Sequence, residues 1–188
     1  MKKRCAWVSE DPLYVEYHDK EWGVPVYRDQ DLFEMITLEG AQAGLSWITI
    51  LKRRENYRNA FDNFDPNIIH TYSEEKIEEL LLDEGIIRNK LKVRSAVTNA
   101  AAFIKVQKEF GSFSKYLWEF VGGEPILNDW NTPVEVPVST KESEALSKDL
   151  KKRGFKFVGP VICYAFMEAI GMVNDHTREC YLYHGHKE

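Results

Sequence analysis

The sequence is poor in cysteine, and its three cysteines cannot all pair with one another. An odd cysteine count without a secretion signal argues against a disulfide framework, so we expect a reducing, cytoplasmic location. No run approaches the ~18 apolar residues that a membrane span needs. The basic start is followed by Glu10 and Asp11 before any apolar stretch develops, which is not the pattern of a signal peptide. We therefore expect no membrane association.

The sequence also lacks a net positive charge. The formal net charge is −5, whereas a nucleic-acid-binding domain is usually basic. Basic residues nevertheless cluster locally, at residues 52–54 and again at Lys148, Lys151, Lys152, Arg153 and Lys156. A solvated helix face is the simpler interpretation of each cluster. The second cluster runs directly into a turn bounded by glycines.

Strand-like alternation is almost absent. It occurs at residues 134–138, where Pro133 and Pro137 favour an extended loop instead. Hydrophobic residues make up 44% and charged residues 29% of the sequence, an ordinary globular composition. A length of 188 residues suits one domain, expected to span residues 1–188. Apolar residues at helical spacing fill most of the chain, so we predict an all-α fold.

Residues that cap helices precede most of the predicted helices. Asp29 can cap the first of them, and Asp65-Pro66 combines a cap with proline at the first helical position. Gly111 would end the longest. The helices are expected over residues 29–38, 46–61, 73–82, 89–110, 113–120, 140–153 and 160–171, with a further start at residue 66.

Four potential metal ligands lie near the two ends of the chain: Cys5, His18, His176 and Cys180. Two cysteines and two histidines could form one tetrahedral zinc site that joins the termini. His176 and Cys180 are four residues apart, so on a helix they would share a face. The alternative is that these are ordinary free cysteines and histidines.

Aromatic residues crowd the first fifty positions, and a carboxylate lies among them. Glu39 shares a helix face with Met35 and Ile36, the face that should turn inward. A buried carboxylate is costly unless it has partners or a function. The aromatic residues are Trp7, Tyr14, Tyr17, Trp22 and Trp47. Either they form core packing, with Glu39 at a solvated helix end, or they form a pocket for a flat, cationic ligand such as an alkylated nucleobase.

The segment from Leu150 to Pro160 is expected to form a helix, a glycine-bounded turn and a second helix. Gly154 and Gly159 allow the backbone to turn tightly and to approach another surface closely. Backbone N–H groups at the start of the second helix can hold a phosphate. An ordinary connection between two helices is the alternative.

Several motifs resemble those of one family along nearly the whole chain. They are Arg4-Cys5-Ala6-Trp7, Asp11-Pro12-Leu13-Tyr14, Tyr17-His18-Asp19, Glu21-Trp22-Gly23-Val24-Pro25, Leu38-Glu39-Gly40, Gln42-Ala43-Gly44-Leu45-Ser46-Trp47, Lys52-Arg53-Arg54-Glu55-Asn56-Tyr57, residues 151–159, and Val173-Asn174-Asp175-His176 with Cys180. Together they resemble the constitutive 3-methyladenine DNA glycosylase family (DNA-3-methyladenine glycosylase I), a member of the helix-hairpin-helix superfamily of base-excision repair enzymes.

The resemblance implies a structural site for one zinc ion at the four Cys and His residues named above. It also implies a pocket for an extruded base, in which Glu39 reads the base, Trp47 stacks on it and Tyr17 lines the pocket. Further walls would come from Trp7, Tyr14 and Trp22. The DNA contacts would be Leu45, a wedge on the Gly44-Leu45 loop, and the phosphate-binding turn with Gly154, Lys156 and Gly159.

The implied activity is hydrolysis of the N-glycosidic bond of 3-methyladenine, and of other N3-alkylated purines as further candidates, in alkylated double-stranded DNA. Free 3-methyladenine would be the product. No lysine is proposed as a Schiff-base nucleophile, so we expect no strand cleavage. A monomer is the default expectation.

The chain departs from the superfamily pattern in two places. The turn lacks the usual proline-glycine sequence, and Asn174 stands where the superfamily commonly has a catalytic aspartate, with Asp175 next to it. The cationic 3-methyladenine base is already a good leaving group, so selection and positioning matter more than strong acid catalysis.

Two other functions fit part of the pattern. One is a non-enzymatic, zinc-stabilised DNA-binding module, against which an anionic pocket argues. The other is a hydrolase with catalytic zinc, in which His184 or His186 could serve as a ligand. Four protein ligands leave no open coordination position, which argues against this second function.

Overall fold

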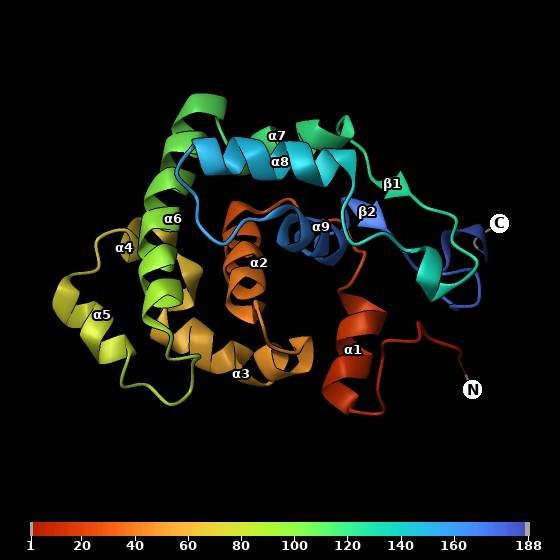
Figure 1. Cartoon of the computed structure of the whole chain (residues 1–188), viewed down its shortest axis with the longest axis horizontal. Helices are drawn as coiled ribbons and strands as arrows, with labels where there is room; N and C mark the ends of the chain where they lie inside the picture. Colours follow the sequence, from red (N-terminus) through yellow and green to blue (C-terminus); the bar gives the residue numbers. More distant parts are fainter. Residues whose placement is uncertain (1, 187–188) are drawn as a thin grey trace.

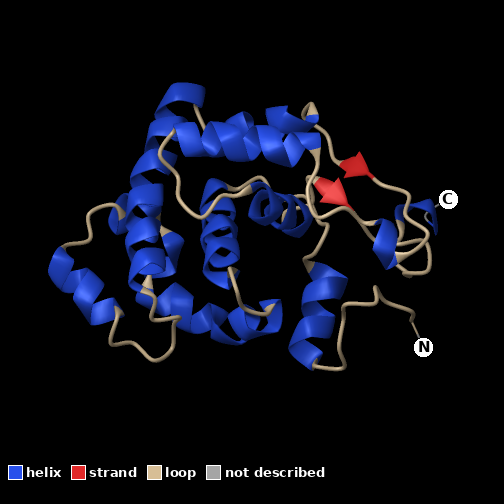
Figure 2. Cartoon of the chain, viewed as in Figure 1, coloured by secondary structure: helices blue, strands red, loops and turns tan. Residues whose placement is uncertain are grey.

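Helices form most of the molecule (Figures 1 and 2), in agreement with the predicted all-α class. The computed structural model describes residues 2–186. The α-helices are α1 (Pro12–Lys20), α2 (Asp29–Gln42), α3 (Trp47–Ala60), α4 (Pro66–Ile69), α5 (Glu74–Leu80), α6 (Lys90–Phe110), α7 (Phe113–Trp118), α8 (Lys141–Lys152) and α9 (Pro160–Ala169). None of the described helices is long and apolar enough to cross a membrane.

Short elements complete the described chain. The 3₁₀ turns are Asp62–Phe64, Glu119–Val121, Pro133–Glu135 and His184–His186. Strands β1 (Ile126–Leu127) and β2 (Val173–Asn174) pair in parallel, with Ile126 opposite Val173. This pair was not predicted, because two residues are too few to show an alternating pattern.

Most helix boundaries follow the capping residues. Asn89 begins α6 by accepting a hydrogen bond from the backbone N–H of Lys92. Gly111 ends the same helix with a φ of +88°, a conformation that glycine adopts without strain. The side chains of Ser73 and Asp65 cap α5 and α4 as predicted.

The prediction for Asp29 was wrong. Arg28 is the N-cap of α2, and Asp29 is already inside the helix. Its carboxylate instead accepts hydrogen bonds from the backbone N–H groups of Phe113 and Ser114, each at 2.9 Å. Asp29 therefore caps α7, a helix far along the chain, and such a long-range cap leaves no local signal.

Helix α1 was missed by the sequence analysis. Asp11 caps it, its side chain accepting from the backbone N–H of Leu13, and Pro12 occupies the first helical position. Its long side chains include aromatic, charged and apolar types with no clear apolar face, so hydrophobic spacing did not reveal it.

The core is built around α2, which lies in the middle of the molecule between α6 and α9 (Figure 1). Leu32 and Phe33 of α2 are fully buried, as are Phe103 of α6 and Phe166 of α9. The first and last described segments of the chain lie on the same side of the molecule (Figure 1), and the backbone N–H of Tyr181 donates to the carbonyl of Lys3 at 2.8 Å. This arrangement brings residues near both ends of the chain into one site.

Candidate active site and metal site

A cavity of about 450 Å³ opens between α1, α2, the start of α3, α9 and the loop around residues 133–138. All six residues expected to form a pocket line it: Trp7, Tyr14, Tyr17, Trp22, Glu39 and Trp47. The ring centroids of Trp7 and Tyr14 are 5.1 Å apart, and those of Tyr17 and Trp47 are 5.6 Å apart. The aromatic residues thus form a continuous wall around open space. This arrangement favours a pocket over simple core packing.

Glu39 lies in α2 at the edge of this space and is 4% exposed. The alternative that it occupies a solvated helix end is therefore wrong. Desolvation raises the pKa of its carboxyl to about 8, and no donor among the described residues opposes this effect. A buried carboxyl group without a donor is stabilised most by a ligand that brings both positive charge and hydrogen-bond donors.

A second unpartnered polar group lies in the cavity wall. The indole N–H of Trp47 is buried and has no hydrogen-bond partner within residues 2–186. A buried donor left without a partner costs about 1–3 kcal/mol. Both Glu39 and Trp47 are therefore less well satisfied than ordinary buried polar groups.

Tyr164, Glu168 and Asp175 also line the cavity and were not assigned to it from the sequence. Asp175 accepts hydrogen bonds from Asn128 Nδ2 at 2.7 Å, from Trp130 Nε1 at 2.8 Å and from the Tyr164 hydroxyl. Desolvation, together with the nearby Asp175, raises the pKa of Glu168 well above its ordinary value. A lone carboxylate in the otherwise apolar α9 was the available signal for Glu168.

An apolar rim also lines the cavity and was not predicted. It consists of Pro133, Val136, Pro137, Val138 and Val161. Val138 and Val161 are 70% and 54% exposed, so the rim reaches the surface at the mouth of the cavity. The segment from residue 134 to 138 is a loop, as expected, with a 3₁₀ turn at its start.

The predicted wedge residue lies on an exposed turn beside the cavity. Gly44 has a φ of +81°, and the large apolar side chain of Leu45 is 39% exposed. Gln42 and Trp47, which precede and follow this turn, both line the cavity. Leu45 is therefore available to a partner that approaches the cavity mouth.

The glycine-bounded turn connects α8 to α9. Gly154 has a φ of +94°, and Gly159 is the N-cap of α9 with a φ of −62°. A Cβ added at Gly159 would meet no atom within 4 Å, so neither backbone conformation nor crowding within the chain requires glycine there. Lys156 is exposed on the same turn. The open space beside Gly159 is compatible with close approach of another molecule.

Parts of the two basic clusters are committed to internal ion pairs. Arg54 Nη1 lies 2.7 Å from Glu21, and Lys52 Nζ lies 3.1 Å from Asp11. Arg153 contacts both Asp149 and Glu109. These cations form ion pairs with neighbouring acidic side chains, whereas the simpler interpretation placed both clusters on solvated helix faces.

The four predicted metal ligands come together in a buried cluster. Their ligand atoms all lie within 4.8 Å of one another. The Cys180 Sγ–His176 Nδ1, Cys180 Sγ–His18 Nε2 and Cys5 Sγ–His176 Nδ1 distances are 3.4, 3.5 and 3.5 Å. Zinc bound tetrahedrally, with bonds of 2.3 Å to sulfur and ~2.05 Å to nitrogen, would separate sulfur from nitrogen by about 3.5 Å. The donor set and its spacing therefore fit a zinc ion.

Surrounding groups orient both histidines. His18 Nδ1 is 2.8 Å from Asp19 Oδ1, and His176 Nε2 is 3.2 Å from the carbonyl of Trp22. Such contacts leave the other ring nitrogen free for a metal. The two thiols interact directly, which lowers the pKa of Cys180 and raises that of Cys5. A metal requires both sulfurs as thiolates, so its binding would release protons.

One detail of the metal prediction changes. His176 and Cys180 are brought together by a turn at Arg178 and Glu179, and the segment is not helical. His184 and His186 do not belong to the cluster, because their Nε2 atoms contact the carbonyls of Asn128 and Arg178.

The cluster and the cavity share a wall. Cys5 lines the cavity, the Trp7 ring packs on His18 at 5.3 Å, and the Trp22 ring packs on His176 at 4.8 Å. Anything that orders the cluster also orders this part of the aromatic wall.

A family model described as methyladenine glycosylase matches residues 7–184. The chain is similar to DNA-3-methyladenine glycosylase 1 of Escherichia coli (strain K12), with 52% identity over 98% of this chain and 99% of that protein. It is also similar to a crystal structure of 3-methyladenine DNA glycosylase I, with a TM-score of 0.94 and 52% identity over 96% of this chain and 100% of that chain. A variant of 3-methyladenine DNA glycosylase I in complex with 3-methyladenine has a TM-score of 0.92 and 37% identity, over 95% of this chain and 96% of that one. The chain therefore belongs to the methyladenine glycosylase family.

Proposed function

We propose that this chain is a DNA-3-methyladenine glycosylase, which hydrolyses the N-glycosidic bond of 3-methyladenine in alkylated DNA. The observation that carries the proposal is Glu39, a buried carboxyl without a donor among the described residues, at the edge of a cavity walled by aromatic rings. Family membership supports the same reaction. Other N3-alkylated purines are further candidate substrates.

Glu39 would select the damaged base by its charge. Methylation at N3 leaves adenine positively charged in DNA, and a cation next to a carboxyl favours the ionised form. Glu39 would then accept hydrogen bonds from the base, while Trp47 stacks on its face. Stacking of a base on an aromatic ring contributes about 1–3 kcal/mol, which helps to offset the few kcal/mol needed to extrude the base.

Cleavage would follow from the substrate's own chemistry. The cationic base leaves as neutral 3-methyladenine, the deoxyribose passes through an oxocarbenium-like state, and water adds to the sugar and releases one proton to solvent. Tyr17, Tyr14, Trp7 and Trp22 would enclose the base. Because no residue forms a covalent bond with the sugar in this scheme, the strand stays intact.

We also propose that the partner is double-stranded DNA. Leu45, on the Gly44-Leu45 turn, would fill the gap left by the extruded base. The turn with Gly154, Lys156 and Gly159 would contact the phosphate backbone, as the hairpin of the helix-hairpin-helix superfamily does, although it lacks the proline-glycine sequence. Exposure of Leu45 and the open space beside Gly159 support these roles.

Cys5, His18, His176 and Cys180 would hold one structural zinc ion. When bound, zinc supplies a fixed link between the ends of the chain and no chemistry at the sugar, because four protein ligands leave no open position. We further propose one domain over residues 1–188 that acts as a monomer in the cytoplasm.

The test is to incubate the protein with alkylated duplex DNA and to identify the released bases by chromatography. We expect 3-methyladenine in the supernatant and an intact strand on a denaturing gel. The Glu39→Gln variant is the matched control, since it keeps the shape of the side chain and removes its charge. DNA binding without base release would instead favour a binding module, and a borohydride-trapped adduct would contradict simple hydrolysis.

A further inference from the structure

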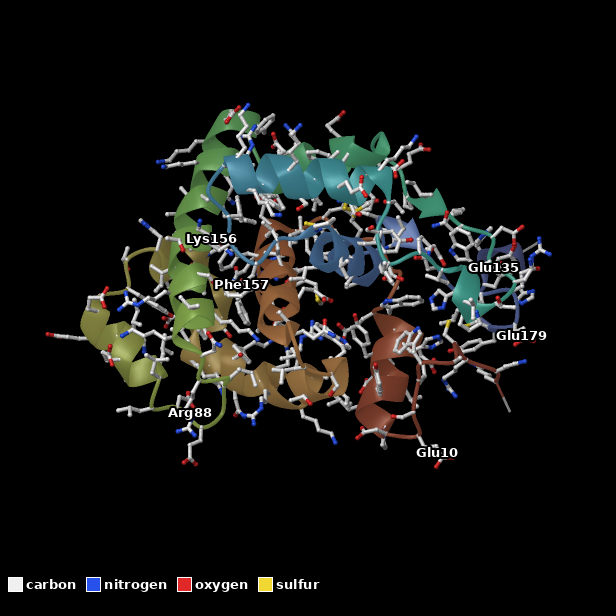
Figure 3. The ribbon with its side chains drawn as sticks, viewed as in Figure 1. Glu10, Arg88, Glu135, Lys156, Phe157 and Glu179 are labelled. Atoms are coloured by element: carbon white, nitrogen blue, oxygen red, sulfur yellow. The ribbon has the colours of Figure 1, made fainter. Side chains whose placement is uncertain are left out.

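Two loops that are proposed to contact DNA lie against the same helix. The turn after α2 carries Leu45, and the turn after α8 carries Lys156. In Figure 1 the chain after α8 passes between α6 and α2, and Figure 3 shows Lys156 and Phe157 on this stretch. The two turns are more than a hundred residues apart in sequence, so contacts across α6 must set their spacing.

Lys92 of α6 holds the first turn. Its ammonium group donates to the carbonyls of Ala41 at 2.9 Å and Ala43 at 2.7 Å, at the end of α2. Helix α2 has no basic residue in its own last turn. A cation there satisfies carbonyls that the helix leaves unpaired and complements the helix dipole. Ala43 directly precedes Gly44, so Lys92 fixes the point from which the Leu45 turn departs.

Asn99 of α6 holds the second turn. Its Oδ1 accepts from the backbone N–H of Lys156 at 2.8 Å, and its Nδ2 donates to the carbonyl of the same residue at 3.0 Å. Asn99 is 5% exposed. The next residue, Phe157, has a φ of +55°, which is unfavourable for a side chain of this size. Two hydrogen bonds from one side chain thus help to hold a strained turn in place.

Lys92 and Asn99 lie on one face of α6. They are seven residues apart, which corresponds to two helical turns and about 10.5 Å along the axis. Between them helix α2 also approaches the second turn closely, because a Cβ on Gly40 would lie 3.3 Å from Phe157 Cβ. Gly40, Phe157, Lys92 and Asn99 all line one small cavity of about 20 Å³. Since Gly40 follows Glu39, this junction also adjoins the base pocket.

We propose that Lys92 and Asn99 are positioning residues, which fix the distance between the Leu45 turn and the phosphate-binding turn. Neither residue lines the cavity assigned to the base. The inference rests on the proposed function, because it assigns a purpose to two turns whose DNA contacts belong to that proposal. Lys92 acts through Leu45, and Asn99 acts through Lys156.

The test for Lys92 measures single-turnover excision from alkylated duplex DNA. Lys92→Met should lower the rate roughly 10-fold or more, since small misplacements of a contacting group are costly. It should leave the affinity for free 3-methyladenine unchanged, because the pocket stays intact. In a Leu45→Ala background the same substitution should change the rate by less than about twofold, since the group it positions is gone. Lys108→Met, the same change at an exposed site on α6, is the control.

Three outcomes would overturn the role of Lys92. An excision rate equal to that of the unmodified chain would do so, as would an undiminished loss in the Leu45→Ala background. The third concerns salt: each direct phosphate contact contributes about −0.9 to the slope of log K against log salt concentration. A slope reduced by that amount in Lys92→Met would mean that Lys92 contacts DNA directly. Lys92→Arg should largely restore the rate, because a guanidinium can still donate to both carbonyls.

The test for Asn99 measures duplex affinity. Asn99→Leu should weaken binding several-fold, and Asn99→Asp should lie between it and the original chain, since it still accepts from the Lys156 N–H. If Asn99→Leu does not fold, Asn99→Asp and Asn99→Ser provide the comparison. Affinities for duplex equal to that of the original chain in folded variants would refute the inference. Absence of excision by the unmodified chain would instead remove the proposed function itself.

Discussion

The cavity and the Cys₂His₂ cluster are neighbours that both contain buried polar groups, but they differ in how these groups are satisfied. In the cluster each histidine contacts a thiol through one ring nitrogen and an oxygen through the other. In the cavity, Glu39 and the Trp47 indole N–H have no partner within the described residues. A satisfied polar group is suited to a structural role, whereas an unsatisfied one is suited to a ligand.

The largest expected effect is on the cluster. Structural zinc sites in small domains have apparent binding energies of about 10–16 kcal/mol. A chelator, or Cys180→Ala, should therefore lower the melting temperature sharply and disturb the aromatic wall as well. Calorimetry with and without chelator, combined with metal analysis by mass spectrometry, measures the effect. A melting transition that does not respond to the chelator would contradict a structural metal site.

In contrast to loss of the metal, Glu39→Gln should cause a large loss of activity without loss of stability. Removing one preorganised group that stabilises charge in a reacting complex costs roughly 10²–10³-fold in rate in well-studied enzymes. Single-turnover excision of 3-methyladenine from duplex DNA measures the loss, and circular dichroism checks the fold. Unchanged excision would show that Glu39 does not read the base.

Asp175 provides a comparison inside the cavity, because it is a carboxylate with three donors where Glu39 has none. Asp175→Ala leaves these buried donors without an acceptor, at about 1–3 kcal/mol for each. We therefore expect a lower free energy of unfolding in urea, in contrast to Glu39→Gln. Zinc content must be measured alongside, since His176 is adjacent. Equal free energies of unfolding for Asp175→Ala and Glu39→Gln would contradict the proposed difference between the two carboxyl groups.

The part of the site that the sequence revealed comes from one stretch of chain. The cavity residues from Trp7 to Trp47 lie within the first fifty positions, where aromatic crowding and an inward-facing carboxylate are visible together. Tyr164, Glu168 and the apolar rim reach the cavity only through the packing of α9 and the loop before α8. No local spacing encodes that packing. The same limit explains Asp29, whose capping partner is eighty-four residues away.

Ligand types were more predictable than their geometry. Two cysteines and two histidines at the ends of the chain were enough to indicate a tetrahedral site, although a turn and not a helix brings His176 to Cys180. Helix boundaries were predictable where a cap and the helix it caps are neighbours in sequence, as at Asn89. Helix α1 has good caps but no apolar stripe, and there the hydrophobic pattern was insufficient.

The pH dependence of activity tests the role of the unpartnered Glu39 carboxyl further. Burial raises the pKa of Glu39 to about 8 from the ordinary 4.5. Because the ionised form is the one that attracts the cation, kcat/KM should rise by about tenfold per pH unit below pH 8 and level off above it. A profile that is flat between pH 6 and about 9 would contradict this role of Glu39.

The free energy of unfolding should fall as the pH rises, whereas kcat/KM should increase. Between about pH 4.5 and 8 the folded state keeps the Glu39 proton and the unfolded state loses it, so stability falls by about 1.4 kcal/mol per pH unit from this group. Glu39→Gln removes this dependence, and its advantage in urea unfolding should grow as the pH rises towards 8. An advantage that does not change with pH would mean that the carboxyl is ionised in the folded chain.

The smallest expected effect concerns the second unpartnered group. Trp47→Phe keeps an aromatic face for stacking and removes the buried indole N–H, which has no partner within residues 2–186. Removing that donor should raise the free energy of unfolding by about 1 kcal/mol, less the packing lost with the smaller ring. Excision should fall less than in Trp47→Ala, where the loss of stacking costs about 1–3 kcal/mol. If Trp47→Phe instead loses as much activity as Trp47→Ala, the indole N–H donates to the bound base, and Trp47 then joins Glu39 as a polar group whose missing partner is the ligand.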